Sequence, residues 1–264
     1  MNPFRDLMNA AGDRAPLGTW LMSGSPIVAE AMGRAGFAWG VVDMEHAPLD
    51  LSTLVGLLQA LSGTGLVPVT RVPWNDTVTI KRVLDAGAHT LLVPFVQDAE
   101  EAARAVAATR YPPEGVRGMA AMSRGSLFGT IPDYYRAANQ RVSVIVQLES
   151  QAAVDRLEAI AAVPGVEGLF LGPADLSGSL GVPGQMAHPQ VKAVMADVAK
   201  RARAAGRWIG TVGGTAEAVL EYRAMGYDFV AVASDLGMLM RTASGLVQTL
   251  TSAPAPAAKE QGGY

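Results

Sequence analysis

Short apolar segments recur along the chain, and polar segments with a helical pattern lie between them. Each apolar segment is rich in β-branched residues and has the length of a single strand. Strands that alternate with helices are typical of a parallel sheet wrapped by helices. The pattern predicts eight strands, at residues 17–22, 39–43, 67–71, 90–94, 142–149, 166–172, 208–212 and 229–233.

Helical periodicity follows these strands. Eight strand–helix units in about 250 residues predict an α/β fold of the (β/α)8 (TIM) barrel type, a single domain at residues 1–250. A doubly wound open sheet is the alternative, but it usually has fewer strands and a glycine fingerprint after the first, which is missing after Leu17-Gly-Thr-Trp20. Residues 251–264 are expected to be a disordered tail. The predicted helices cover residues 27–36, 51–62, 77–86, 99–110, 151–162, 174–180, 189–205, 215–225 and 236–250.

The composition narrows the classes of function. Of 264 residues, 50% are hydrophobic and 17% are charged, which is enough for a substantial core. The net charge of −3 argues against nucleic acid or a membrane surface as the main partner. Without a long apolar run or the residue order of a signal peptide, we expect a cytoplasmic protein. The chain has no cysteine, so candidate metal ligands are oxygen and imidazole groups.

Two acids stand at the ends of two predicted strands. Glu149 closes the fifth apolar segment, and Asp175 follows the sixth. The carboxyl ends of barrel strands carry the chemistry, so both acids are expected at one site. Two converging carboxylates repel unless a cation lies between them, which favours a divalent ion with oxygen ligands. The alternative is that both are unrelated helix caps.

More ionisable groups follow the second and third strands. Asp43, Glu45 and His46 leave one strand end together, and Arg71 leaves the next. Asp85 lies near the C-terminal end of a predicted helix, where the helix dipole disfavours an anion, so we expect it to pair with His46. Asp43 and Glu45 are expected to orient these groups. The alternatives are a structural histidine and a surface ion pair of Arg71.

Further residues are expected to complete the site. Gln147 shares the strand face of Glu149. The turn Gly172-Pro173-Ala174 places free N–H groups at a helix start, where they can meet an anion such as a substrate carboxylate. Glycine-rich turns after the last two strands favour a phosphate site instead. Residues 111–136 are expected to form an active-site loop, and residues 119–124, Trp20 and Val212 are expected to line one side of the pocket.

From about residue 4 to residue 250 the chain resembles the HpcH/HpaI family of metal-dependent (class II) pyruvate aldolases. The resemblance implies cleavage of 4-hydroxy-2-oxo acids to pyruvate and an aldehyde in a homo-hexamer, a trimer of dimers that exchange their last helices. It lies in the motifs Asp43-Met-Glu-His-Ala-Pro48, Arg71-Val-Pro-Trp-Asn75, Ile80-Lys-Arg-Val-Leu-Asp-Ala-Gly87, Arg110-Tyr-Pro-Pro-Glu-Gly-Val-Arg-Gly118, Val146-Gln-Leu-Glu149 and Gly172-Pro-Ala-Asp-Leu-Ser177.

The resemblance also implies a role for each site residue. His46 corresponds to the base, Asp85 to the acid that strengthens it, and Arg71 to the stabiliser of the enolate. Glu149 and Asp175 correspond to the ligands of a divalent cation such as Mg²⁺, Mn²⁺ or Co²⁺. Gln147 and Ala174 correspond to substrate contacts. In a hexamer, the Asp85 that serves a given His46 can come from a neighbouring chain.

Within the family, the motifs Arg124-Gly-Ser-Leu-Phe-Gly-Thr130, Glu149-Ser-Gln151 and Ser234-Asp-Leu-Gly237 are most similar to the 2-dehydro-3-deoxyglucarate aldolases, which release tartronate semialdehyde. The chain departs from that branch at Met44, Leu49 and Ala174. The donor is expected to be pyruvate, with hydroxypyruvate as an alternative. A lysine Schiff base is disfavoured because no lysine stands at a predicted strand end. Two competing functions stay open, a metal-free phosphate-binding isomerase and a barrel that binds 2-oxo acids without turnover.

Overall fold

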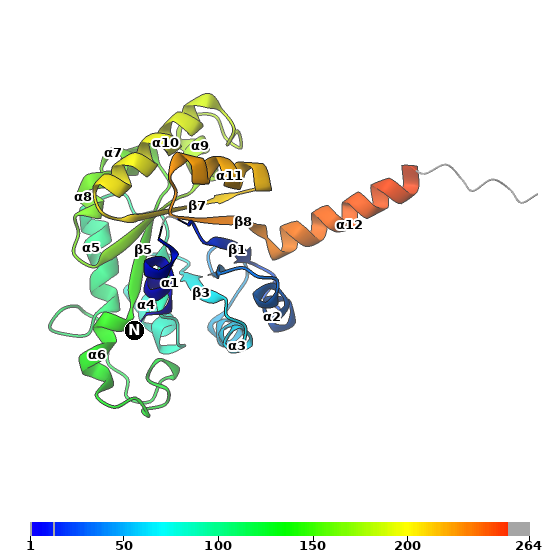
Figure 1. Ribbon diagram of the computed structural model, residues 1–264. Coiled ribbons are helices and arrows are strands. Elements are labelled where there is room, and N and C mark those ends of the chain that lie inside the picture. The colour runs from blue at the N-terminus through cyan, green and yellow to red at the C-terminus, as the bar shows by residue number, and fades with distance from the viewer. Residues whose placement is uncertain (1, 13, 253–264) are drawn as a thin grey trace, which may run out of the picture.

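The computed structural model describes residues 2–12 and 14–252 and is a closed barrel of eight parallel strands in sequential order, with helices around it (Figure 1). The TIM barrel predicted from the sequence is thereby confirmed. All eight predicted strands are present, with ends that differ by at most one residue. They are β1 (Leu17–Leu21), β2 (Trp39–Asp43), β3 (Val67–Arg71), β4 (Thr90–Val93), β5 (Ser143–Leu148), β6 (Val166–Leu171), β7 (Trp208–Gly213) and β8 (Phe229–Ser234).

Helices follow the strands where the periodicity predicts them, except that the predicted helix at 151–162 is divided in two. Side-chain caps begin several of them, such as Ser25, Asp50 and Asp98, which fits the preference of these residues for helix starts. The helices are α1 (Pro3–Ala11), α2 (Pro26–Arg34), α3 (Leu51–Leu61), α4 (Thr77–Asp85), α5 (Ala99–Thr109), α6 (Tyr134–Arg141), α7 (Gln151–Asp155), α8 (Leu157–Ala161), α9 (Pro173–Ser179), α10 (Pro189–Ala204), α11 (Ala216–Met225) and α12 (Asp235–Ser252), with a 3-10 turn, η1 (Arg124–Ser126).

Two apolar layers make up the core. One lies between the sheet and the surrounding helices. The other fills the barrel interior with side chains of one strand parity, because alternate strand residues face the same side. Large rings need space there: a Cβ on Gly18 would lie 2.2 Å from the Trp39 ring, and one on Gly210 would lie 2.2 Å from the Phe229 ring. The interior layer consists of Phe4, Met8, Trp20, Trp39, Val41, Val69, Leu92, Ile145, Phe170, Phe229 and Ala231.

Helix α1, which the strand–helix pattern did not predict, closes one end of this interior. Asn2 caps it by accepting from the N–H groups of Phe4 and Arg5 at 3.0 Å, while its own amide donates to the carbonyl of His89 at 2.7 Å. Phe4 packs edge-to-face against Trp39 and against Phe229. The opposite end, where the strands finish, stays open for a site.

The long segment at residues 111–136 does not lie at that open end, so its prediction as an active-site loop is wrong for the single chain. It follows α5, which has already returned the chain to the amino ends of the strands. There Arg124 Nη1 donates to the carbonyl of Ala86, just after α4, at 3.1 Å. The segment also contains η1 and the start of α6, neither of which was predicted.

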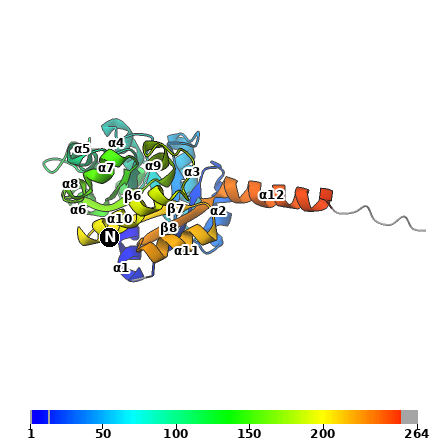
Figure 2. The same cartoon turned by 90° about the horizontal axis from the view of Figure 1, so that it is seen from above.

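The last helix, α12, extends away from the barrel in both views (Figures 1 and 2). It contacts the barrel at β1 and β8. The helix continues to Ser252, two residues into the segment expected as a disordered tail, and the rest of that segment, 253–264, lies outside the described residues. Across residues 2–12 and 14–252, no helix combines the length and the apolar character needed to cross a membrane.

Candidate active site

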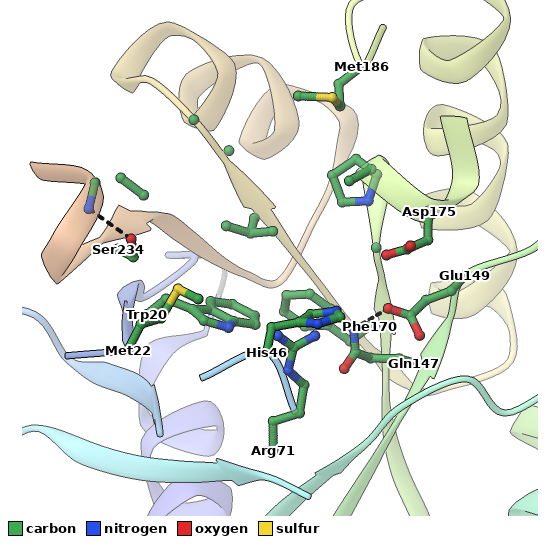
Figure 3. Close-up of a pocket in the computed structure, with 18 of the residues that line it drawn as sticks. Trp20, Met22, His46, Arg71, Gln147, Glu149, Phe170, Asp175, Met186 and Ser234 are labelled. Atoms are coloured by element: carbon green, nitrogen blue, oxygen red, sulfur yellow. Dashed lines mark hydrogen bonds between the residues drawn. The ribbon is translucent and has the colours of Figure 1, made fainter. Parts of the chain in front are cut away.

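A cavity of about 520 Å³ opens at the carboxyl ends of the strands (Figure 3). The structure brings together ten of the residues that the sequence suggested for the site. The unexpected members of the lining include Met22, Phe170, Met186, Tyr222 and Arg241. The ten predicted members are Trp20, His46, Arg71, Gln147, Glu149, Gly172, Pro173, Ala174, Asp175 and Val212.

Strand parity explains why these side chains meet. Ile145 faces the barrel interior, so Gln147 and Glu149, two and four residues later, face the same way and emerge at the open end. The same relation leads from Val69 to Arg71. Each interior row is therefore apolar at the closed end and polar at the open end.

Arg71 is held between two carboxylates. Its Nε and Nη2 donate to the two oxygens of Asp43, at 2.9 and 2.6 Å, and its Nη1 lies 2.8 Å from Glu45 Oε2. The guanidinium carbon lies 5.4 Å from the centre of the Trp20 ring, a cation–π contact. With its side chain only 8% exposed, Arg71 has a fixed position at the cavity wall.

Asp43 also shapes the turn that carries His46. This fully buried acid accepts hydrogen bonds from the backbone N–H groups of Glu45, at 3.0 Å, and His46, at 3.3 Å. The His46 side chain is 62% exposed, and its Nε2 lies 4.0 Å from Glu45 Oε1. Burial raises the pKa of Glu45, and the charge of Arg71 opposes that rise. The hydrogen bonds of Asp43 thus shape the turn that carries His46, and the orienting role of Asp43 and Glu45 stays a prediction.

Glu149 and Asp175 reach the same side of the cavity (Figure 3). Glu149 Oε1 accepts from Gln147 Nε2 at 2.8 Å, and Oε2 accepts from the Phe95 N–H at 2.9 Å. A Cβ at position 172 would lie 2.9 Å from Glu149 Oε1, so Gly172 leaves the space that this carboxylate occupies. Neither acid is a helix cap, because Ser150 caps α7 and Gly172 precedes α9.

The electrostatics of this carboxylate pair call for a cation. Burial, followed by the negative charges of Glu45 and Asp175, raises the pKa of Glu149 to about 7. The Arg71 guanidinium lowers the pKa of Glu149 only a little, because its charge is already paired with Asp43 and Glu45. A cation between the two carboxylates would favour their charged forms and so oppose the rise in the pKa of Glu149.

The donor set fits a hard divalent ion. Within the described residues, no three His, Cys, Asp or Glu side chains converge, so the chain offers two carboxylates and not a complete shell. Mg²⁺ is commonly bound in this way, with water and substrate oxygens supplying the other positions. The buried oxygen Gln147 Oε1, which has no hydrogen-bond partner in the described part of the chain, lies beside this pair and is a further hard acceptor.

Backbone strain accompanies the site. Phe95, just after β4, and Ala233, near the end of β8, have φ values of 54° and 49°, in the left-handed region that non-glycine residues seldom adopt. The Phe95 conformation directs its N–H to Glu149, and Ala233 lines the cavity. Strain of this kind is found where a site needs a fixed geometry. Neither residue carries a sequence signal for it, since neither is a glycine.

Asp85 does not meet His46 within one chain. Helix α4 runs back along the barrel, so Asp85 at its last turn lies at the amino ends of the strands, opposite His46. Asp85 Oδ1 accepts from Arg117 Nη2 at 2.7 Å, and the Arg117 side chain is 1% exposed and lies over the Tyr111 ring. Residues 119–124 belong to this end as well and do not line the cavity, in contrast to Trp20 and Val212.

Several residues that line the cavity were not predicted from the sequence. Phe170 has the interior parity of Gly172, which could have identified it. Met186, Tyr222 and Arg241 come from outside the strands, and only the packing of the helices brings them to the cavity. Strand-end arguments cannot find such residues, because nothing local in the sequence relates them to a strand.

The comparisons with known proteins agree on one family. Residues 17–242 match the HpcH/HpaI aldolase/citrate lyase family. The 2-dehydro-3,6-dideoxy-6-sulfogluconate aldolase of Pseudomonas putida is 51% identical over 244 residues, which cover 92% of this chain and 96% of that one. The 5-keto-4-deoxy-D-glucarate aldolase of Salmonella paratyphi A is 46% identical over 239 residues, 90% and 93% of the two chains.

A solved structure agrees with the sequence comparisons. A HpcH/HpaI aldolase/citrate lyase family protein from Burkholderia cenocepacia superimposes with a TM-score of 0.91 at 41% identity, covering 96% of this chain and all of the other. The (β/α)8 barrel with a cavity at its open end is therefore a carbon–carbon lyase of the aldolase type. The chain belongs to the HpcH/HpaI aldolase/citrate lyase family.

Proposed function

We propose that this chain is a metal-dependent aldolase that cleaves 4-hydroxy-2-oxo acids to pyruvate and an aldehyde and catalyses the reverse addition. The observation that carries the proposal is the meeting, in one cavity, of the Glu149–Asp175 pair with the fixed guanidinium of Arg71. Together they provide a place for a cation and a donor for an oxygen that becomes negative.

Glu149 and Asp175 would hold Mg²⁺, Mn²⁺ or Co²⁺, and the bound ion would act as a Lewis acid for the keto group. Arg71 still has N–H groups free after its contacts with Asp43 and Glu45, and one of them would donate to the keto oxygen as the enolate forms. Residues 172–174, at the start of α9, and Gln147 would position the pyruvate half. Its reacting carbon would then face His46.

His46 would take the proton of the 4-hydroxyl group when the C3–C4 bond breaks and return it in the addition. Its exposure leaves room for a carboxylate of another chain. We propose that the Asp85 of a neighbouring subunit supplies that carboxylate, because its own Asp85 lies at the other end of the barrel. Arg117 donates to one oxygen of Asp85, and the Asp85 side chain is 24% exposed.

The aldehyde half would lie against Trp20, Phe170 and Val212 on the cavity floor. The names of both relatives specify six-carbon acids with a second anionic group at the end remote from the pyruvate half, a sulfonate in one and a carboxylate in the other. We therefore propose deoxy keto-sugar acids as substrates, which release a short hydroxyaldehyde acid such as tartronate semialdehyde. Hydroxypyruvate would be a second donor.

The test is exchange of pyruvate methyl protons in D₂O, followed by NMR, with EDTA and after Mn²⁺ is restored. Metal-dependent exchange, and pyruvate release from a 4-hydroxy-2-oxo acid, would support the aldolase. Exchange that persists after full chelation would contradict the proposed dependence on a metal ion. Binding of pyruvate with neither exchange nor cleavage would indicate the alternative function, a barrel that binds 2-oxo acids without turnover.

The alternative of a phosphate-binding isomerase has less support in the geometry. A phosphate site after β7 and β8 would need free backbone N–H groups there. The Asp235 carboxylate already accepts from the N–H groups of Met22, Ser23 and Leu236, and Ser234 Oγ accepts from that of Gly237. The N–H groups of Leu236 and Gly237 are therefore already engaged, and the negative charge of Asp235 would repel a phosphate there.

A further inference from the structure

One cation in the cavity is not used by the proposed chemistry. Arg241, on α12, lines the cavity, and its Nη1 donates to the carbonyl of Gly214, after β7, at 2.6 Å. This contact fixes one corner of the guanidinium and leaves other N–H groups free. Its side chain is exposed, so incoming substrate can reach it.

Arg241 and Arg71 also differ in the charges that surround them. Asp43 and Glu45 neutralise Arg71. Arg241, by contrast, forms no ion pair with any carboxylate in the part of the chain that the structure describes. The nearby Asp235 is engaged by backbone N–H groups. Arg241 is thus a positive charge at the cavity that lacks an anion.

The end of β8, which leads into the helix that carries Arg241, lies across the cavity from the carboxylate pair. Figure 3 shows Ser234 on the side opposite Glu149 and Asp175, with Trp20 and His46 between. Ser234 is the last residue of β8, directly before α12. A substrate whose 2-oxo acid end meets Glu149 and Asp175 therefore extends past the Trp20 ring toward this side.

We propose that Arg241 is a specificity-determining residue that binds an anionic group at the far end of the aldehyde half. The planar guanidinium can donate two parallel hydrogen bonds to a carboxylate, sulfonate or phosphate group. The inference rests on the proposed aldolase function and adds the part of the site that selects the aldehyde. Neutral aldehydes make no use of Arg241.

The test compares three-carbon 2-hydroxyaldehydes that differ only in their last group. These are glyceraldehyde, tartronate semialdehyde, 3-sulfolactaldehyde and glyceraldehyde 3-phosphate, each added to pyruvate by the wild type and by Arg241→Gln. For the best anionic aldehyde, kcat/KM should fall about tenfold or more, the scale for losing a hydrogen bond to a charged group. With glyceraldehyde it should stay nearly unchanged. The anion that suffers the largest loss identifies the group that Arg241 binds.

Arg241→Lys should keep part of the preference for anionic aldehydes because it keeps the charge. Arg104→Gln, an exposed arginine on α5 far from the cavity, is the matched control. Light scattering should confirm that Arg241→Gln keeps the wild-type oligomer. An equal loss on neutral and anionic aldehydes, or no loss on any, would overturn the proposal. Wild-type protein that fails to exchange pyruvate protons would instead refute the aldolase function itself.

Discussion

Arg71 shows how much of the site is settled by contacts around a single side chain. The carboxylate of Asp43 accepts two hydrogen bonds from Arg71, the Glu45 carboxylate lies 2.8 Å from Arg71 Nη1 as an ion pair, and Trp20 covers the guanidinium face. The remaining donors therefore point in a fixed direction without reorganisation during the reaction, which is the condition for stabilising a developing negative charge.

Replacement of Arg71 by lysine keeps the charge and loses this geometry. Lysine offers a mobile point charge and cannot make the two parallel bonds to Asp43. We expect Arg71→Lys to lower kcat by about 10²-fold or more, the scale for losing one oxyanion donor. Steady-state kinetics with saturating metal measure this. A change in KM alone would mean that Arg71 binds only the ground state.

Glu149 connects the metal site to stability. In the metal-free protein its pKa is raised from 4.5 to about 7. Below pH 4.5 the folded and unfolded forms are both protonated, so the shift has no effect there. As the pH rises to about 7, the unfolded chain loses this proton more readily, and the folded state is destabilised by at most about 3 kcal/mol.

Glu149→Gln removes that penalty. In EDTA, we expect the variant to gain free energy of unfolding relative to the wild type as the pH rises from 4.5 to 7, with a constant gain above 7. Denaturant titrations across this range measure it, with Glu30→Gln on α2 as the exposed control. Mn²⁺ should stabilise the wild type and not the variant. A pH-independent difference would mean that the burial and charge around Glu149 do not act as described.

At this scale the sequence predicted most of the polar site. Gln147, Glu149 and Arg71 lie on strands whose parity is set by apolar neighbours, so the alternation alone directs them into the barrel mouth. Arg241 and Met186 were not predictable, because their distance from the site depends on how whole helices pack. The positive φ of Phe95 was also hidden, since it is imposed by the fold on an ordinary residue.

Among the elements, α4 determines where Asp85 lies relative to His46. The residue types favour a pairing of Asp85 with His46, but they do not show whether both residues belong to one chain. A helix that follows a strand runs antiparallel to it, so its last turn lies at the amino ends of the strands. The same rule places residues 111–136, which follow α5, at that end. Strand and helix positions were predictable from periodicity, whereas α1 and α6 fell outside the repeat.

Helix α12 carries apolar residues with the spacing of a contact stripe. They recur at intervals of three, four and seven residues and are exposed. Arg241 is not part of this stripe. An apolar stripe on a helix that leaves the barrel supports the expectation that subunits exchange their last helices. The stripe consists of Leu236, Leu239, Met240, Leu246, Val247 and Leu250.

An aspartate in this stripe should weaken the assembly. We expect Leu246→Asp to shift the protein to a smaller oligomer, since a charge buried at an apolar contact costs more than the lost leucine area, itself worth about 2 kcal/mol. Light scattering after size-exclusion chromatography measures the mass. Gln248→Asp adds the same charge outside the stripe and should keep the wild-type mass. If both variants keep that mass, the stripe is not an interface.

At the scale of the whole molecule, the proposed pairing of His46 with Asp85 needs a second chain. His46 and Arg71 stand at the open end, while Asp85 stands at the closed end, held by Arg117. Within one chain the barrel separates them. An assembly that sets the closed end of one barrel near the open end of another would supply the carboxylate that the exposed His46 lacks.

Mixing two defective variants tests this arrangement. His46→Ala and Asp85→Asn should each be inactive or nearly so in pyruvate exchange and in aldol cleavage, because the base or its partner is missing. When they are dissociated together and reassembled, some sites combine His46 from the Asp85→Asn chain with Asp85 from the His46→Ala chain. With random assembly about one site in four is intact, so activity should return to about a quarter of the wild type. Each variant reassembled alone is the control and should stay inactive. If the mixture gains nothing while mass spectrometry shows mixed oligomers, then Asp85 does not serve the His46 of another chain.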